Sequence, residues 1–174
     1  GIKTVMTIHN LKFQGVWDVK TMKDIVGLPD YYFTPDKLEY KKDGNLLKGG
    51  IVYANAITTV SRTYAEEIKM PYYGEGLDGL MRARANDLRG IVNGIDYEEF
   101  DPQTDKEIYA NYSPRTFRRE KVKNKTALQQ DLGLTVDPKT MLIGIVSRLT
   151  DQKGFDLIAY VMDEMCQDAV QFAV

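Results

Sequence analysis

The sequence has 174 residues, of which 43% are hydrophobic and 28% are charged, a composition typical of a folded globular protein. Its formal net charge of -2 argues against a nucleic-acid-binding face spread over the whole chain, and no apolar run approaches the length of a membrane span. The single cysteine, Cys166, excludes an internal disulfide, so we expect a reducing, cytoplasmic location.

The first half of the chain alternates strand and helix patterns. Ile2–Ile8 is β-branched and apolar, as in a buried strand, and His9-Asn10 follows where that strand should end. Ser61 is placed to cap the helix after the second strand. We expect strands at 2–8, 56–60 and 88–92, helices at 19–28, 45–54, 62–69 and 80–87, and loops at 11–17, 30–43 (with one short helix) and 71–79.

The second half continues the alternation after Phe100-Asp101-Pro102, which breaks regular structure and is our candidate boundary between two lobes. Gly133 is suited to close a long helix. The predicted elements are a helix at 114–132, a turn at 136–139, a strand at 141–146, a helix at 154–167 and a strand at 170–174. This alternation predicts an α/β fold with parallel, doubly wound sheets, and both ends of the chain cut through that architecture, as in a fragment of a larger enzyme.

Two glycines interrupt the helical pattern of residues 45–54. Gly49 and Gly50 each cost the helix about 1 kcal/mol relative to alanine. We therefore expect another backbone, or a ligand, to approach closely at this pair.

Two cations flank the turn between the strand at 141–146 and the helix that follows. Arg148 offers a planar fork of donors and Lys153 a compact positive charge, a combination suited to a diphosphate at a helix N-terminus. Ligands of open α/β sheets bind outside the carboxyl ends of the strands, where this turn lies. The alternative is that both cations pair with Asp151 and Asp156 on a solvated turn.

Seven short motifs, in order and spacing, resemble those of the bacterial glycogen synthases and plant starch synthases across nearly the whole chain. Each alone is weak, but together they are highly specific. They are Thr7-Ile8-His9-Asn10, Phe13-Gln14-Gly15, Leu47-Lys48-Gly49-Gly50, Thr58-Thr59-Val60-Ser61, Gly76-Leu77-Asp78-Gly79, Val92-Asn93-Gly94-Ile95-Asp96 and the segment Ser147 to Gly154.

The resemblance implies parts of two Rossmann-like domains of a retaining GT-B glycosyltransferase. Residues 1–95 would be the C-terminal half of the N-terminal, acceptor-side domain, 96–104 the interdomain hinge and 105–174 the start of the nucleotide-sugar-binding domain. The implied activity is transfer of glucose from ADP-glucose to the non-reducing end of an α-1,4-glucan, with neither a cofactor nor a metal. The family's donor loop, which comes earlier in its sequences, and its later acidic motif and glycine-rich loop are absent from this chain, so the segment alone is expected to be inactive.

The resemblance also assigns roles to individual residues. Arg148 and Lys153 match the pair that holds the donor diphosphate, and His9 matches the histidine near the donor glucose; we count these three as catalytic. Asn10 and Asn93 resemble residues that hydrogen-bond the glucosyl unit. Without the motif, Asn93 is read as a left-handed turn residue at the hinge and His9 as a structural histidine. The last members of the predicted substrate-binding set are Gly49 and Gly50, which match a family element and whose expected role is close backbone packing beside the cleft.

Two alternatives to this function are a retaining glucosyltransferase that uses UDP-glucose and a non-catalytic glucan-binding module. In the second, the aromatic rings of the two tyrosine-rich loops would stack on sugars, although buried packing is favoured for them: Tyr31, Tyr32, Phe33, Tyr72 and Tyr73. The expected partners are ADP-glucose and the glucan, with no nucleic acid and no membrane, and exposed sheet edges predict self-association of the segment.

Overall fold

The computed structural model describes the backbone of residues 1–174 and the side chains of residues 1–150 and 152–174. The chain forms two compact units, Gly1–Gly94 and Ile95–Val174, which are described separately. Among the helices within the described residues, none has both the length and the apolarity that a membrane crossing requires.

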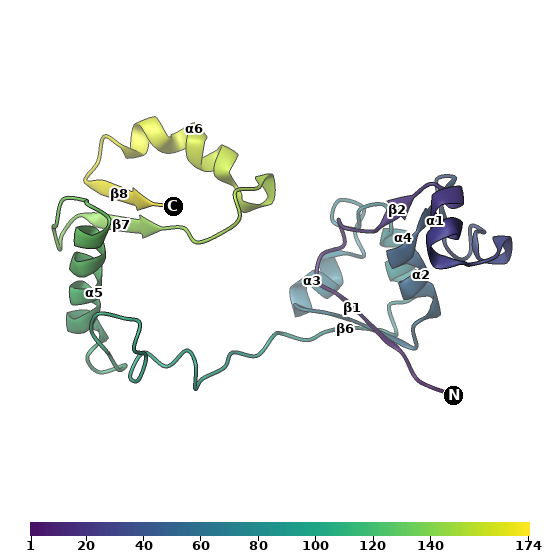
Figure 1. Cartoon of the computed structure of the whole chain (residues 1–174), viewed down its shortest axis with the longest axis horizontal. Coiled ribbons are helices and arrows are strands. Elements are labelled where there is room, and N and C mark those ends of the chain that lie inside the picture. The colour runs from purple at the N-terminus through teal and green to yellow at the C-terminus, as the bar shows by residue number, and fades with distance from the viewer. The chain divides into compact units, whose positions relative to one another are not determined.

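The first unit combines a parallel sheet with a small antiparallel one (Figure 1). The parallel sheet has the order β1-β5-β6, with Val5 opposite Ala56 and Ile57 opposite Leu88. The antiparallel sheet has the order β2-β4-β3. The elements of this unit are β1 (Val5–Ile8), β2 (Val16–Trp17), α1 (Val19–Val26), the 3₁₀ helix η1 (Asp30–Tyr32), β3 (Glu39–Tyr40), β4 (Asp43–Asn45), α2 (Leu46–Tyr53), β5 (Ala56–Thr59), α3 (Arg62–Glu67), α4 (Asp78–Ala83) and β6 (Leu88–Gly90).

The core of the first unit lies between the parallel sheet and its helices. Ile8 and Ile57 contribute from adjacent strands, and Ile51, Ala65 and Met81 contribute one residue from each of three helices. Burial of a side chain of this size contributes about 1.5–3 kcal/mol, so this cluster fixes the helices against the sheet. The predicted cap of α3 is confirmed, since the Ser61 hydroxyl accepts the Tyr64 N–H. At α2, the Asn45 side chain accepts the Lys48 N–H in the same way, a cap that was not predicted.

The second unit contains the other parallel pair. Its elements are α5 (Phe117–Asp131), β7 (Met141–Gly144), the 3₁₀ helix η2 (Asp151–Lys153), α6 (Phe155–Met165) and β8 (Val170–Ala173). β7, α6 and β8 form a strand–helix–strand unit whose two strands are adjacent and parallel, with Met141 opposite Val170 (Figure 1). Gly133 has φ of 67°, as expected of a residue that closes a helix.

Three predictions of local structure are wrong. The loops predicted at 11–17 and 30–43 contain the antiparallel sheet, so strand–helix alternation is not continuous. β1 begins at Val5, and only Ile8 of its four residues is buried, because β1 is an outer strand of the described sheet. The short helix predicted at 80–87 is α4, which begins two residues earlier and ends at Ala83.

Arg84 accounts for the early end of α4. Its guanidinium donates to the carbonyl oxygens of Ile51 and Ala54 at 2.6 and 2.7 Å, and it pairs with Asp87 at 2.8 Å. These bonds satisfy carbonyl groups at the end of α2 that have no partner within the helix. Residues 84–87 therefore form the turn that leads into β6.

Candidate functional site

His9 lies at the carboxyl end of β1, where its imidazole is exposed. The residues on either side of the His9–Asn10 segment are anchored, because Ile8 and Leu11 are 2% and 0% exposed. The N–H of Leu11 donates to the hydroxyl of Tyr64 at 3.0 Å. The Asn10 Oδ1 accepts the N–H of Lys12 at 3.0 Å, which shapes the turn after His9. The segment thus presents His9 from a backbone fixed at both ends.

Asn93 belongs to the same edge of the parallel sheet. β6 lies on the other side of β5 from β1, and its carboxyl end is followed by Ile91, whose N–H donates to the Thr59 carbonyl at 2.7 Å. Since the carboxyl ends of parallel strands share one edge, the segments of His9 and Asn93 both leave from it. Asn93 is exposed and is not among the positive-φ residues, so its interpretation as a left-handed turn residue is wrong.

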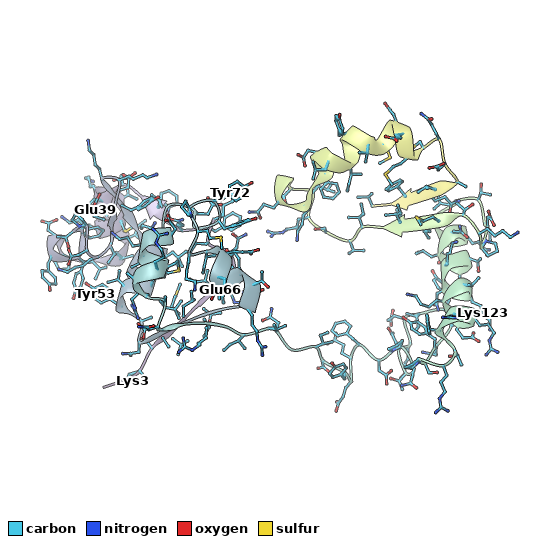
Figure 2. All side chains as sticks on the ribbon, turned by 180° about the vertical axis from the view of Figure 1, so that it is seen from behind. Lys3, Glu39, Tyr53, Glu66, Tyr72 and Lys123 are labelled. Atoms are coloured by element: carbon cyan, nitrogen blue, oxygen red, sulfur yellow. The ribbon has the colours of Figure 1, made fainter. Side chains whose placement is uncertain are left out.

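Gly49 and Gly50 lie in α2, and each faces a close neighbour. A Cβ at Gly49 would be 2.8 Å from the Leu38 Cγ, and one at Gly50 would be 3.1 Å from the Met6 Sδ. Both glycines also line a cavity of about 380 Å³ together with Tyr53 of α2, which is labelled in Figure 2. The closest neighbours are side chains, so the expectation that another backbone approaches this pair is wrong, and side-chain packing within the first unit explains the two glycines.

Lys48, which precedes the two glycines, makes hydrogen bonds within the first unit. Its ammonium group donates to the carbonyl oxygens of Pro35 and Glu39, each at 2.5 Å. The ammonium therefore ties the loop before β3 to α2. Lys48 has this structural role although it belongs to a motif of the candidate site.

The tyrosine-rich loops are more exposed than predicted. Tyr72 and Tyr31 are 85% and 67% exposed, and Tyr72 stands at the surface of the first unit in Figure 2. Tyr72 and Tyr73 meet edge to face with their ring centroids 4.8 Å apart. The favoured interpretation of these rings as buried packing is therefore wrong for Tyr31, Tyr72 and Tyr73.

In the second unit, Arg148 and Lys153 lie on the open turn between β7 and α6. The turn is held by backbone bonds from the Thr150 N–H to the Arg148 carbonyl and from the Lys153 N–H to the Thr150 carbonyl, both at 2.9 Å. Gly154 has φ of 72° and precedes the first residue of α6 without a side-chain cap. The positive φ explains this glycine, since a Cβ there would meet nothing closer than 3.8 Å.

Both cations are exposed, and neither makes an ion pair with any side chain that the structure describes. The alternative in which they pair with Asp156 is therefore wrong. The part of that alternative that involves the Asp151 side chain lies outside the described residues. A guanidinium and an ammonium near uncapped helix amides are available to an anion.

A buried glutamine positions β7 and hence the turn after it that carries Arg148 and Lys153, called here the cation turn. Gln129 of α5 is 0% exposed; its Nε2 donates to the Asp137 carbonyl at 3.0 Å and to the Gln171 Oε1 at 2.7 Å. A hydrogen bond from the Thr140 hydroxyl, and another from the Lys139 N–H, hold the pKa of Asp137 below its ordinary value. The turn at residues 137–140 leads directly into β7. Through Gln129, α5 and β8 together therefore fix the strand that ends before Arg148 and Lys153.

The predicted site residues are thus divided between the units. His9, Asn10, Gly49, Gly50 and Asn93 belong to the first, and Arg148 and Lys153 belong to the second. Across the described residues, no group of three or more His, Cys, Asp or Glu side chains could hold a metal ion.

Comparison with known proteins covers the whole chain. The starch synthase catalytic domain family matches residues 1–83. The glycogen synthases of Lachnospira eligens and Lachnoclostridium phytofermentans are 69% and 63% identical to it over all 174 residues. The chain spans 36% of the length of each of these relatives.

A solved structure extends the similarity to the fold. The catalytic domain of starch synthase IV from Arabidopsis thaliana, bound to ADP and acarbose, is 31% identical and superposes with a TM-score of 0.87. The match covers 98% of this chain and 35% of that one. It confirms the predicted fold class, parts of two Rossmann-like domains of the GT-B type. The matches in sequence and structure together show that the chain is similar to the glycogen synthases and starch synthases over nearly its whole length.

Proposed function

We propose that this chain is part of a glycogen synthase that transfers glucose from ADP-glucose to the non-reducing end of an α-1,4-glucan with retention of configuration. Its relatives at 69% and 63% identity are glycogen synthases, which supports a glycosyltransferase. The similar starch synthase was solved with ADP and acarbose, which supports an adenine nucleotide donor and a glucan acceptor. The chain alone, about a third of the length of its relatives, is expected to have no transferase activity.

The observation that carries this proposal is the exposure of Arg148 and Lys153 on the turn before α6, where neither pairs with a side chain that the structure describes. A guanidinium can bind two phosphate oxygens at once, and an ammonium adds a point charge beside them. These groups would hold the donor diphosphate and stabilise the negative charge that grows on ADP as the glucosyl bond breaks. Because the positive charge is already in place, the transition state gains it without rearrangement.

The first unit would contribute the groups near the sugar. His9 lies on a fixed segment at the carboxyl edge of the sheet, and the amides of Asn10 and Asn93 can both donate to and accept from glucose hydroxyls. Gly49 and Gly50 would act by letting α2 pack closely against Leu38 and against Met6 of β1, the strand that ends just before His9. The leaving phosphate would assist the incoming hydroxyl, and the reaction would proceed in the cytoplasm without a metal or cofactor.

The proposal is tested in a chimera in which this chain replaces the 174 matched residues of the Lachnospira eligens glycogen synthase. Lys153→Ala and Arg148→Ala should each reduce kcat by about 10²–10³-fold, the usual effect of removing one preorganised donor. Lys139→Ala removes an exposed lysine from the turn before β7 and should leave kcat unchanged.

Turnover of Lys153→Ala within threefold of the unsubstituted chimera would contradict the assigned role. The donor is tested by competition between ADP-glucose and UDP-glucose in the same assay. A preference for UDP-glucose would favour the alternative glucosyltransferase.

A further inference from the structure

A buried glutamine joins three segments around the His9 turn. Gln14 is 9% exposed and lies in the loop after β1. Its Nε2 donates to the carbonyl oxygens of Leu11 at 3.1 Å and Glu75 at 3.0 Å, and its Oε1 accepts from the Asn45 Nδ2 at 2.6 Å. Both the nitrogen and the oxygen of this one amide are therefore hydrogen-bonded, and the three partners come from different parts of the first unit.

The orientation of the Gln14 amide is determined by its neighbours. Asn45 is 0% exposed, and its Oδ1 accepts the Lys48 N–H at 2.8 Å as the N-cap of α2. Its Nδ2 must therefore be the group that faces Gln14, which requires the Gln14 oxygen on that side. The Gln14 Nε2 is then left to face two backbone carbonyls, which can only accept.

The first carbonyl that Gln14 holds belongs to the anchor of the His9 segment. Leu11 is bonded at its N–H by Tyr64 and at its carbonyl by Gln14, so both backbone groups of the buried residue are fixed. His9 and Asn10 lie between this anchor and β1. A change in the Leu11 backbone would therefore displace the imidazole.

The second carbonyl belongs to a strained loop. Glu75 has φ of 49° although it is not a glycine, and Gly76 follows with φ of 79°. Such a conformation persists only where surrounding contacts maintain it. The Gln14 amide is such a contact, assisted by the Tyr40 hydroxyl at 3.5 Å from the same Glu75 oxygen.

We propose that Gln14 is a positioning residue for glucosyl transfer, whose buried amide locks the His9–Asn10 segment to the Glu75 loop and to the N-terminus of α2. It touches neither substrate nor reacting atoms in this assignment. The inference rests on the proposed function for its catalytic consequence, but the coupling of the three segments is a property of the first unit alone.

The test uses Gln14→Glu in the same chimera. This change keeps the size of the side chain but places a carboxylate oxygen against two carbonyl oxygens, so both donated bonds are lost. A displacement of about 1 Å at a reacting group can reduce the rate by 10²-fold, so we expect kcat to fall by roughly that factor. The KM for ADP-glucose should change by a smaller factor than kcat, because the cations proposed to hold the donor diphosphate, Arg148 and Lys153, belong to the other unit.

Amide hydrogen exchange provides a second measurement that does not need activity. Residues 9–13 and 72–77 should both exchange at least tenfold faster in Gln14→Glu, while β7 and α6 are unaffected. Gln130→Glu, an exposed glutamine on α5, is the matched control for charge and should change neither measurement. If Gln14→Glu does not fold, Gln14→Met removes the same hydrogen bonds without adding a charge.

The outcomes separate the two proposals. If the unsubstituted chimera transfers glucose and Gln14→Glu retains its kcat, the positioning role is overturned while the proposed function stands. If the chimera transfers no glucose, the proposed function fails. Amide hydrogen exchange then still tests whether Gln14 couples residues 9–13 to residues 72–77. Faster exchange in both segments supports the coupling, and faster exchange in one or neither overturns it.

Discussion

At the scale of single residues, two different physical causes explain why particular positions of this protein are glycines. Gly154 is a glycine because its φ is positive, whereas Gly49 is one because Leu38 leaves no room for a Cβ. Gly50 is a milder case, since its neighbour is the flexible thioether of Met6. The two adjacent glycines of α2 should therefore respond differently to substitution.

We predict that Gly49→Ala lowers the free energy of unfolding by about 1–3 kcal/mol through overpacking against Leu38. Gly50→Ala should change it by less than about 1 kcal/mol, because the helix propensity of alanine offsets the adjustment of Met6. Urea unfolding of both variants measures the difference. Leu38→Ala combined with Gly49→Ala should cost less than the sum of the two single changes, and equal losses for the two glycine variants would contradict this account.

At the scale of elements, α5 carries a buried carboxylate that its own helix neutralises. Glu120 is 8% exposed, and its oxygens pair with Lys123, labelled in Figure 2, and Arg119, both at 2.6 Å. These bonds hold the pKa of Glu120 below its ordinary value of 4.5, and the hydrogen bond from Lys123 contributes most to that lowering. Asp137, in the turn that follows α5, has a lowered pKa as well.

A pKa that is lower in the folded state means that the unfolded state takes up protons first as the pH falls. The stabilisation from Glu120 is therefore complete above its ordinary pKa and is lost as the pH falls through the folded value. We predict that Glu120→Gln makes the free energy of unfolding depend less steeply on pH between about pH 5 and pH 3. Glu107→Gln, at an exposed position, should leave the slope unchanged; equal slopes for all three proteins would contradict the prediction.

At the scale of the whole molecule, the sheets of the 174-residue chain present strand edges. In the part of the chain that the structure describes, β1 pairs with β5 alone, and Val5 of β1 is 62% exposed. Unpaired N–H and C=O groups beside exposed apolar residues favour pairing with another copy.

We predict that the 174-residue chain self-associates as its concentration rises and that Val5→Lys reduces this association, because a charge on an edge strand opposes pairing. Ile25→Lys places the same charge at an exposed apolar position of α1, outside any sheet, and should have little effect. Light scattering over a concentration series measures both. A monomer at every concentration would show that these edges do not pair.

The sequence by itself determined the α/β class, the cap of α3, the parallel strands and the similarity to glycogen and starch synthases, because periodicity, cap chemistry and motif order are properties of local sequence. It did not predict the antiparallel sheet, whose strands β2 and β3 have two residues each and therefore no periodic pattern. The cation turn was identified from sequence because Arg148 and Lys153 are five residues apart, but only the structure shows that neither pairs with Asp156.

Only the tertiary structure decided the role of Gln14. Its partners at residues 45 and 75 lie 31 and 61 positions away in the sequence, and a buried amide has no local signature that distinguishes it from an exposed one. The same reason applies to Leu38 beside Gly49 and to the Lys48 ammonium on two carbonyls. Hydrogen bonds and close contacts between distant segments exist only after the chain has folded, and those from Tyr64 and Gln14 fix the Leu11 backbone next to the His9–Asn10 segment.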